Sequence, residues 1–282
     1  MKNILITGAS GFVGKSFFNY IKKKTNLKVF GTKNKKIRKN SKVKIPLNGK
    51  NVIQCNLSIL SETKKLIYKT KPDIIFHFAA LADHKIGEQN LRECIKNNST
   101  ITRNILKCIG KNTKLVFLST DKVYARNPRL SPENTNIRPI GNLAKEKLKC
   151  EKLIKIKTNK YFILRLPIVH STGSDLKNSL IDSFLYKVKK GKKISAFKNI
   201  KRSFLKIDEF NIFLEKLISE NHFGIYNVGS KVCSYHKRIQ KLIKEEKINP
   251  KNKIEGVYGN VEPQIQEFNT EKLNQIFRIK FS

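Results

Sequence analysis

A glycine-rich turn near the start of the sequence constrains the fold more than any other feature. The apolar run Asn3–Thr7 predicts a short buried parallel strand, and a helix is expected from Gly11 to Lys24. Glycines between such a strand and helix let bare backbone approach a pyrophosphate, while the first helical N–H groups face its oxygens. The sequence therefore predicts a dinucleotide site at Gly8, Ser10, Gly11, Phe12, Val13 and Gly14.

Strand-like and helix-like segments alternate through the first half of the chain. Parallel strands joined by helices need right-handed crossovers, which predicts an α/β fold with a Rossmann-type doubly wound parallel sheet. Further along the chain, loops and helices are expected to dominate. We expect a dinucleotide-binding domain over 1–168 and a smaller substrate-binding domain over 169–282, with strand 223–228 returning to the main sheet. The other expected strands are 27–32, 52–55, 73–78, 114–119 and 161–166, and the other expected helices are 62–70, 91–109 and 142–157.

The end of the second strand bears on which dinucleotide binds. An acid there usually holds the adenosine ribose, but the first acidic residue of this chain is Glu62. Thr32 and Lys33 stand at that position instead, and a basic stretch continues to Lys44. A 2′-phosphate would find cations here, so NADP is favoured over NAD, although lysine is abundant along the whole chain.

The charge and the cysteine content indicate which binding partners and which cellular compartment to expect. The formal net charge is +38, but lysine is spread along the chain, whereas a specific nucleic-acid surface should cluster and favour arginine. We expect non-specific attraction to anions and no specific nucleic-acid partner. The five cysteines form no C-x-x-C pair, which argues against disulfides and zinc and predicts no metal site. With no secretion signal and no apolar run of about 18 residues, a cytoplasmic protein without a membrane span is expected.

Several motifs together resemble one family. The match to the extended short-chain dehydrogenase/reductases, the NAD-dependent nucleotide-sugar epimerases, dehydratases and 4-keto reductases, runs nearly end to end. The motifs that carry it are TGASGFVG at 7–14, KPDIIFHFAA at 71–80, Asn98 with Thr102 and Asn104, LVFLSTDKVY at 115–124, Arg202-Ser203-Phe204 followed by Ile207-Asp208-Glu209, and GIYNVG at 224–229.

The resemblance implies roles for further residues. It implies cofactor contacts at Asn56, Leu57, Phe78, Ala79, Ala80, Asn98 and Lys147, and a substrate-phosphate contact at Arg202, with Lys198 or Lys201 beside it. Ser119-Thr120-Asp121-Lys122 resembles the STDK of nucleotide-sugar 4,6-dehydratases, which implies that Thr120 binds a substrate oxygen and that Asp121 and Lys122 form an acid–base pair. The alternatives are a helix-capping Asp121, a solvated Lys122 and an exposed helical Lys147. Relatives are commonly dimers, so a homodimer is an expectation.

One departure from the family pattern matters for catalysis. The family frame P-x-x-x-Y-G-x-S-K-x-x-x-E falls on 139–151, with Pro139, Lys147 and Glu151 in register and Leu143 at the tyrosine position. Leucine cannot move a proton, and loss of a general acid–base typically costs about 10²–10⁴-fold in rate. Tyr124 is expected first to have a packing role and only second to serve as a substitute acid. His84 is a further candidate base.

Three functions compete at this point. The leading hypothesis is a nucleotide-sugar epimerase, dehydratase or reductase that uses NADP or NAD in surface-polysaccharide or deoxysugar synthesis. The second is an NAD(P)-binding regulatory or partner subunit of the same fold that has lost catalysis, which Leu143 favours. The third, a nucleic-acid-binding protein, rests on charge alone.

Overall fold

The computed structural model describes residues 1–34, 51–124, 132–134, 137–171, 179–250, 254–260, 265–267 and 269–282. The chain forms two compact units. The first comprises residues 1–123, 139–165 and 213–226, and the second comprises 124–138, 166–212 and 227–282. Each unit is therefore assembled from three separate stretches of chain.

A seven-stranded sheet forms the centre of the first unit, in the order β11-β6-β5-β4-β1-β2-β3. The pairings of β1 with β2 and β4, of β2 with β3 and of β4 with β5 are parallel. The chain leaves β1 toward one edge and later resumes at β4 on its other side, so a topological switch point lies between β1 and β4. The predicted doubly wound α/β sheet is confirmed. Its strands are β1 (Lys2–Thr7), β2 (Leu27–Lys33), β3 (Val52–Gln54), β4 (Ile74–His77), β5 (Lys114–Thr120), β6 (Tyr161–Leu166) and β11 (Gly224–Asn227).

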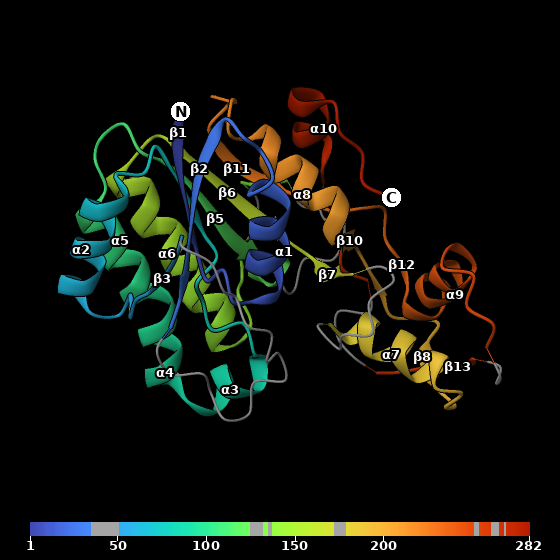
Figure 1. The fold of residues 1–282 in the computed structure, drawn as a ribbon. Coiled ribbons are helices and arrows are strands. Elements are labelled where there is room, and N and C mark those ends of the chain that lie inside the picture. The colour runs from blue at the N-terminus through green and yellow to red at the C-terminus, as the bar shows by residue number, and fades with distance from the viewer. Residues whose placement is uncertain are drawn as a thin grey trace. The chain divides into compact units, whose positions relative to one another are not determined.

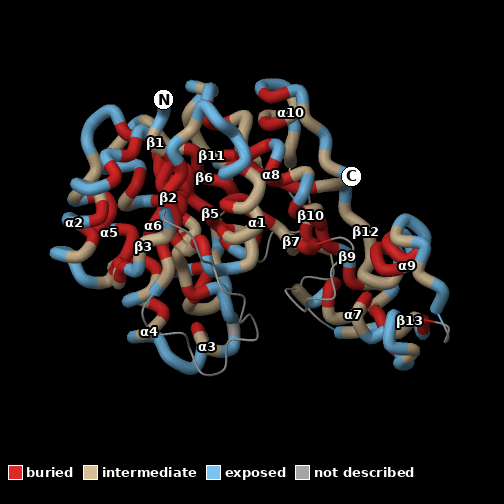
Figure 2. Tube along the Cα trace, in the orientation of Figure 1, coloured by how far each residue is buried: buried red, intermediate tan, exposed pale blue. Residues whose placement is uncertain are grey.

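Helices cover both faces of this sheet (Figure 1). Helix α1 (Phe12–Ile21) lies on one face, and α2 (Leu60–Thr70), α5 (Ile101–Cys108) and α6 (Gly141–Lys157) lie on the other. Buried positions concentrate along the strands (Figure 2). Leu5, Ile75 and Leu115 of the sheet share one apolar cluster with Ile105 of α5 and Ile154 of α6, which fixes these helices on the sheet.

The helix expected over 91–109 is interrupted. It consists of α4 (Leu91–Ile95), a π-helical turn over Lys96–Thr100 and α5. Such turns are rare and often mark functional sites, and Asn98 lies within this one. The short helix α3 (His84–Gln89) and a 3₁₀ turn over Asp121–Tyr124 were not predicted.

The second unit contains more strand than the sequence suggests. Three two-stranded sheets pair β10 with β7, β12 with β9 and β13 with β8. The expectation of loops, helices and a single late strand was wrong here, because strands of two or three residues are too short to show an alternating pattern. The elements are β7 (Ile168–His170), α7 (Leu180–Lys189), β8 (Ser195–Phe197), β9 (Lys201–Arg202), β10 (Phe204–Lys206), α8 (Ile207–Lys216), β12 (Cys233–Ser234), α9 (Tyr235–Glu245), β13 (Glu255–Val257) and α10 (Glu271–Phe277); the boundary between units divides α8.

Candidate functional site

The glycine turn leaves no room for side chains at two positions. Gly8 has φ +68°, and a Cβ there would lie 2.6 Å from the main-chain nitrogen of Ala79. A Cβ on Gly14 would lie 2.2 Å from the carbonyl oxygen of Gly8. The Gly11 N–H donates to that same oxygen at 2.9 Å, which closes the turn. The backbone is therefore the surface that the turn presents, as close approach of a pyrophosphate requires.

The amino terminus of α1 is open to an anion. Gly11 is the N-cap, no side chain caps the helix, and its first turn carries no acid. Thr32, predicted to contact the cofactor, holds the turn: its hydroxyl accepts from the Gly8 N–H at 3.2 Å, and its carbonyl accepts from the Ala9 N–H at 3.0 Å. Lys33 is half-buried, and the rest of the basic stretch, from Lys35 to Lys44, lies outside the described residues.

His77 links three elements at the carboxyl end of β4. Its Nδ1 and Nε2 lie 3.0 Å from the hydroxyls of Thr7 and Thr102, respectively. Burial, with a smaller effect of Lys147, lowers the pKa of His77 to about 3, so the imidazole is neutral near pH 7. The Thr7 hydroxyl also accepts from the Ala79 N–H at 3.2 Å. His77 therefore fixes the backbone that faces Gly8 and is a structural residue.

Thr120 and Asp121 meet at the carboxyl end of β5. The Thr120 hydroxyl donates to Oδ1 of Asp121 at 3.2 Å and accepts from the Lys122 N–H at 3.2 Å. Asp121 is buried, whereas the side chain of Lys122 is exposed. The predicted hydroxyl and carboxylate are therefore adjacent, and this pair can hold or pass a proton.

Lys147 is a buried cation on α6. Its Nζ donates to the carbonyl of Leu118 at 2.8 Å and lies 4.7 Å from the ring centroid of Phe117. Burial lowers the pKa of this ammonium group. The alternative interpretation of an exposed helical lysine is wrong, because α6 turns this residue onto β5 rather than toward solvent.

Leu143 occupies an apolar environment in the first turn of α6. It is 4% exposed and packs with Leu81, Cys94 and Ile86. The helix end nearby is capped from another helix, because Oε1 of Glu88 accepts from the Asn142 N–H at 2.7 Å. The largely apolar surroundings of residue 143 thus match its leucine.

The remaining predicted residues lie after β3, in the π-helical turn, on β9 and after β4. The Asn56 side chain accepts from the N–H of Ser58 at 3.2 Å, and Leu57 is buried. Asn98 donates to the carbonyl of Cys94 at 2.9 Å, while its buried Oδ1 has no partner among the described residues. Arg202, in the second unit, donates to the carbonyl of Lys201 at 2.8 Å. Phe78, Ala79 and Ala80 are half-buried beyond β4.

A buried ion pair beneath the end of β5 was missed. Glu151 of α6 accepts from Nε of Arg165 at 3.1 Å and from its second guanidinium nitrogen at 2.6 Å, and the hydroxyl of Ser119 also donates to it. All three residues are buried. Glu151 lies in the family frame, but nothing in the sequence connects it with Arg165, which is a β6 residue.

The described residues contain neither a cluster of metal ligands nor a membrane-spanning helix. No group of His, Cys, Asp and Glu side chains there could hold a metal ion. No helix in that part of the chain has the length and apolar character needed to cross a membrane.

Comparisons of sequence identify relatives. A family model described as the NAD dependent epimerase/dehydratase family matches residues 4–229. A UDP-N-acetyl-alpha-D-glucosaminuronate decarboxylase of Bacillus cytotoxicus is 31% identical over 126 residues, which cover 44% of this chain and 38% of that protein. The uncharacterized protein MJ1055 of Methanocaldococcus jannaschii is 26% identical over 248 residues, 81% of this chain and 76% of that protein.

Solved structures share the fold over the whole chain. A dTDP-4-dehydrorhamnose reductase of Bacillus anthracis in complex with NADP has a TM-score of 0.81 at 22% identity and covers 100% of this chain and 94% of that one. The Bordetella bronchiseptica enzyme WbmG in complex with NAD and UDP has a TM-score of 0.81 at 19% identity and covers 99% and 90%, respectively. At these identities the likeness is one of fold.

Proposed function

Because the chain belongs to the NAD dependent epimerase/dehydratase family, we propose that it is an NAD(P)-dependent enzyme that converts a nucleotide sugar. The reaction is an epimerisation, dehydration or 4-keto reduction that serves surface-polysaccharide or deoxysugar synthesis. The observation that carries the proposal is the turn at Gly8 and Gly14, where only bare backbone fits, beside an uncapped helix end. The names of the relatives, which include a UDP-sugar decarboxylase and a dTDP-sugar reductase, support the substrate class.

The cofactor would be held chiefly by main chain. The pyrophosphate would face the backbone from Gly8 to Gly14 and the first N–H groups of α1. Thr32 and His77 would act indirectly, by fixing the turn and the Ala79 backbone. When bound, nicotinamide supplies the acceptor or donor of a hydride, so the polypeptide must supply the matching proton transfer at a sugar oxygen.

Thr120 and Asp121 are the proposed groups for that proton transfer. When the sugar hydroxyl is oxidised, the Thr120 hydroxyl would take its proton and pass its own proton to the Asp121 carboxylate, toward which it already donates, and reduction would run the same relay in reverse. The exposed ammonium group of Lys122 would stabilise the carboxylate. Lys147 is proposed to contact the nicotinamide ribose, as the resemblance implies. Arg202 is proposed to bind the substrate phosphates.

A second candidate function rests on Leu143. This residue fills the tyrosine position and is packed among apolar side chains. A protein that binds NAD(P) and partners an active enzyme, without turnover of its own, would tolerate that exchange. It would bind the cofactor as the enzyme does, so only turnover separates the two candidates.

Cofactor titrations test the proposed binding site. The fluorescence of NADPH and of NADH is followed at physiological salt as the protein is added. We expect saturable binding, tighter for NADPH. The Gly14→Ala variant should bind at least tenfold more weakly, because its Cβ would collide with the Gly8 carbonyl.

The Gly110→Ala variant is the matched control, since a Cβ there meets nothing closer than the Thr113 hydroxyl at 3.8 Å. Equal affinities of the two variants and the unchanged protein would contradict the proposed site. Tight NADH with weak NADPH would retain the turn and overturn the preference for NADP.

The compartment and the assembly are also proposals. Five free cysteines, three of them buried, suit a reducing cytosol. A homodimer is proposed from the family resemblance alone, and sedimentation of the purified protein would test it.

A further inference from the structure

The second unit contains a large cavity whose described charged residues are all cationic. Its volume is about 1080 Å³, and it is lined by the segment after β11, by α9 and by the residues at 280–282. Small-molecule sites typically have volumes of about 300–1,000 Å³. Apolar side chains, Val232, Ile254 and Phe281 among them, contribute to the wall. None of the described residues that line the cavity is Asp or Glu. Six are cationic: Lys231, Lys237, Arg238, Lys241, Lys244 and Lys280.

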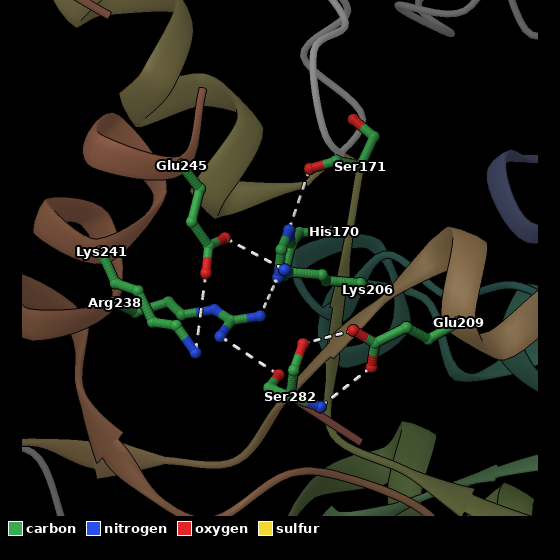
Figure 3. Close-up of polar contacts among 8 residues, drawn as sticks. All are labelled: His170, Ser171, Lys206, Glu209, Arg238, Lys241, Glu245 and Ser282. Carbon is green, nitrogen blue, oxygen red and sulfur yellow. Dashed lines mark hydrogen bonds and ion pairs between the residues drawn. The ribbon is translucent and has the colours of Figure 1, made fainter. Parts of the chain in front are cut away.

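Arg238 is the buried cation of this cavity. Its residue exposure is 2%, whereas the five lysines of the wall are exposed. One guanidinium nitrogen donates to Nε2 of His170 at 2.7 Å, and another donates to the main-chain oxygen of Ser282 at 3.3 Å (Figure 3). The Nε of Arg238 is buried and has no partner among the described residues. A hydrogen-bond donor of this charged group is therefore left unmatched, at an atom without accessible surface.

The groups around Arg238 do not neutralise it. Burial lowers the pKa of His170 to about 4, so its ring is neutral near pH 7; Nδ1 lies 2.9 Å from the Ser171 carbonyl and Nε2 accepts from Arg238. No Asp or Glu side chain in the described part of the chain lies within ion-pair distance of Arg238, although Glu245 and Glu209 are near enough to raise its pKa. The nearby Glu245 pairs with Lys206 at 3.0 Å and with Lys241 at 3.6 Å.

Glu209, the other acid of this cluster, is engaged by the end of the described chain. It accepts from the Ser282 N–H at 2.9 Å and from the Ser282 hydroxyl (Figure 3). Burying a charge without a counter-charge is costly, and burial lowers the pKa of the Arg238 guanidinium. An anion that entered the cavity would supply the counter-charge.

We propose that this cavity is a binding site for a phosphate-bearing small molecule, with Arg238 at its buried end and the lysines of its wall around the ligand. Phosphate is favoured over a single carboxylate because six cations surround the site, and a multiply charged ligand can engage several of them. The apolar part of the wall would hold the organic part of the ligand. The site stands on the cavity and Arg238, so it does not depend on the proposed catalytic function.

Two sources of phosphate fit this chemistry. One is the diphosphate of a nucleotide sugar, and the other is a separate phosphorylated effector. Calorimetric titration of the full chain with inorganic pyrophosphate tests the site at 150 mM KCl, where weak non-specific attraction to a chain of charge +38 is largely screened. Repeating the titration with excess UDP-glucose identifies the source: competition assigns the site to the substrate diphosphate, and simultaneous binding assigns it to a separate ligand.

Three variants decide whether Arg238 makes the site. Arg238→Met should weaken pyrophosphate binding at least tenfold, and the double change Lys237→Met with Lys241→Met should weaken it several-fold. Lys193→Met removes one charge, as Arg238→Met does, from an exposed position of the same unit that does not line the cavity, so it should leave affinity unchanged.

Because Arg238 is buried, circular dichroism is used to check that Arg238→Met still folds. If it does not fold, the pyrophosphate affinity of the double lysine variant tests the proposal in its place. The proposal is overturned if the unchanged protein shows no saturable pyrophosphate binding. It is also overturned if Lys193→Met loses as much affinity as the cavity variants. Neither result would bear on NADPH binding at Gly14, which keeps this test separate from that of the proposed function.

Discussion

Acid should destabilise the first unit through one buried imidazole. The folded protein holds the pKa of His77 at about 3, whereas an unfolded chain has an ordinary imidazole with a pKa near 6.5. Between these two pKa values, the unfolded chain therefore binds a proton at His77 and the folded protein does not. The stabilising contribution is fully present above pH 6.5 and is lost as the pH falls from 6.5 toward 3. By pH 5.0 this one group should lower the free energy of unfolding by about 2 kcal/mol relative to pH 7.5.

The variant His77→Asn isolates this contribution. It should be less stable than the unchanged protein at pH 7.5, because two hydroxyl contacts are altered. Its further loss of stability between pH 7.5 and 5.0 should nevertheless be smaller by about 2 kcal/mol. The measurement is urea unfolding followed by circular dichroism at constant ionic strength. His222→Asn, at a side chain that is 63% exposed, is the control. An equal acid-induced loss in His77→Asn and the unchanged protein would refute the reasoning.

Three further outcomes are expected. Asp121→Asn should lower turnover by about 10²–10⁴-fold and leave the NADPH affinity unchanged, because an amide cannot accept the proton from Thr120. Steady-state rates measure the turnover and fluorescence titration measures the affinity, and unchanged turnover would remove Asp121 from the proposal. Leu143→Tyr should lower stability by about 1–3 kcal/mol in thermal or denaturant unfolding, because a hydroxyl enters an apolar cluster, and a gain in turnover above tenfold would instead favour the impaired-subunit alternative. Glu151→Gln should lower the free energy of unfolding by about 3–5 kcal/mol, because it leaves Arg165 unpaired. Changing both Glu151 and Arg165 to Met should recover most of that loss in the same unfolding assay, and no recovery would argue against the ion pair as its cause.

The sequence was informative where a local pattern has one physical explanation. The turn after β1 is such a place, since glycines at 8 and 14 are required by clashes of 2.6 and 2.2 Å that any Cβ would make. The buried strands β4 and β5 were predicted from their continuous apolar runs, which are typical of parallel sheets. The parallel sheet followed from the alternation of strands and helices, whereas the order of its strands was not predicted.

Other features depend on contacts that no local pattern records. Lys147 resembles many exposed lysines of this chain, and only the packing of α6 on β5 buries it. The pairing of Glu151 with Arg165 joins a helix to a strand, and the His170–Arg238 contact spans 68 positions. The charge of +38 masks such groups, because one buried cation cannot be told from its exposed neighbours by composition.

Turnover of nucleotide sugars decides whether this chain is itself an enzyme. The protein is incubated with a panel of UDP- and dTDP-sugars and with NADP(H) or NAD(H), and products are identified by mass spectrometry and NMR. The account predicts a converted sugar that Gly110→Ala also forms and that Gly14→Ala forms far more slowly. Saturable cofactor binding with no conversion of any sugar, including after Leu143→Tyr, would contradict the claim that this chain is itself an enzyme.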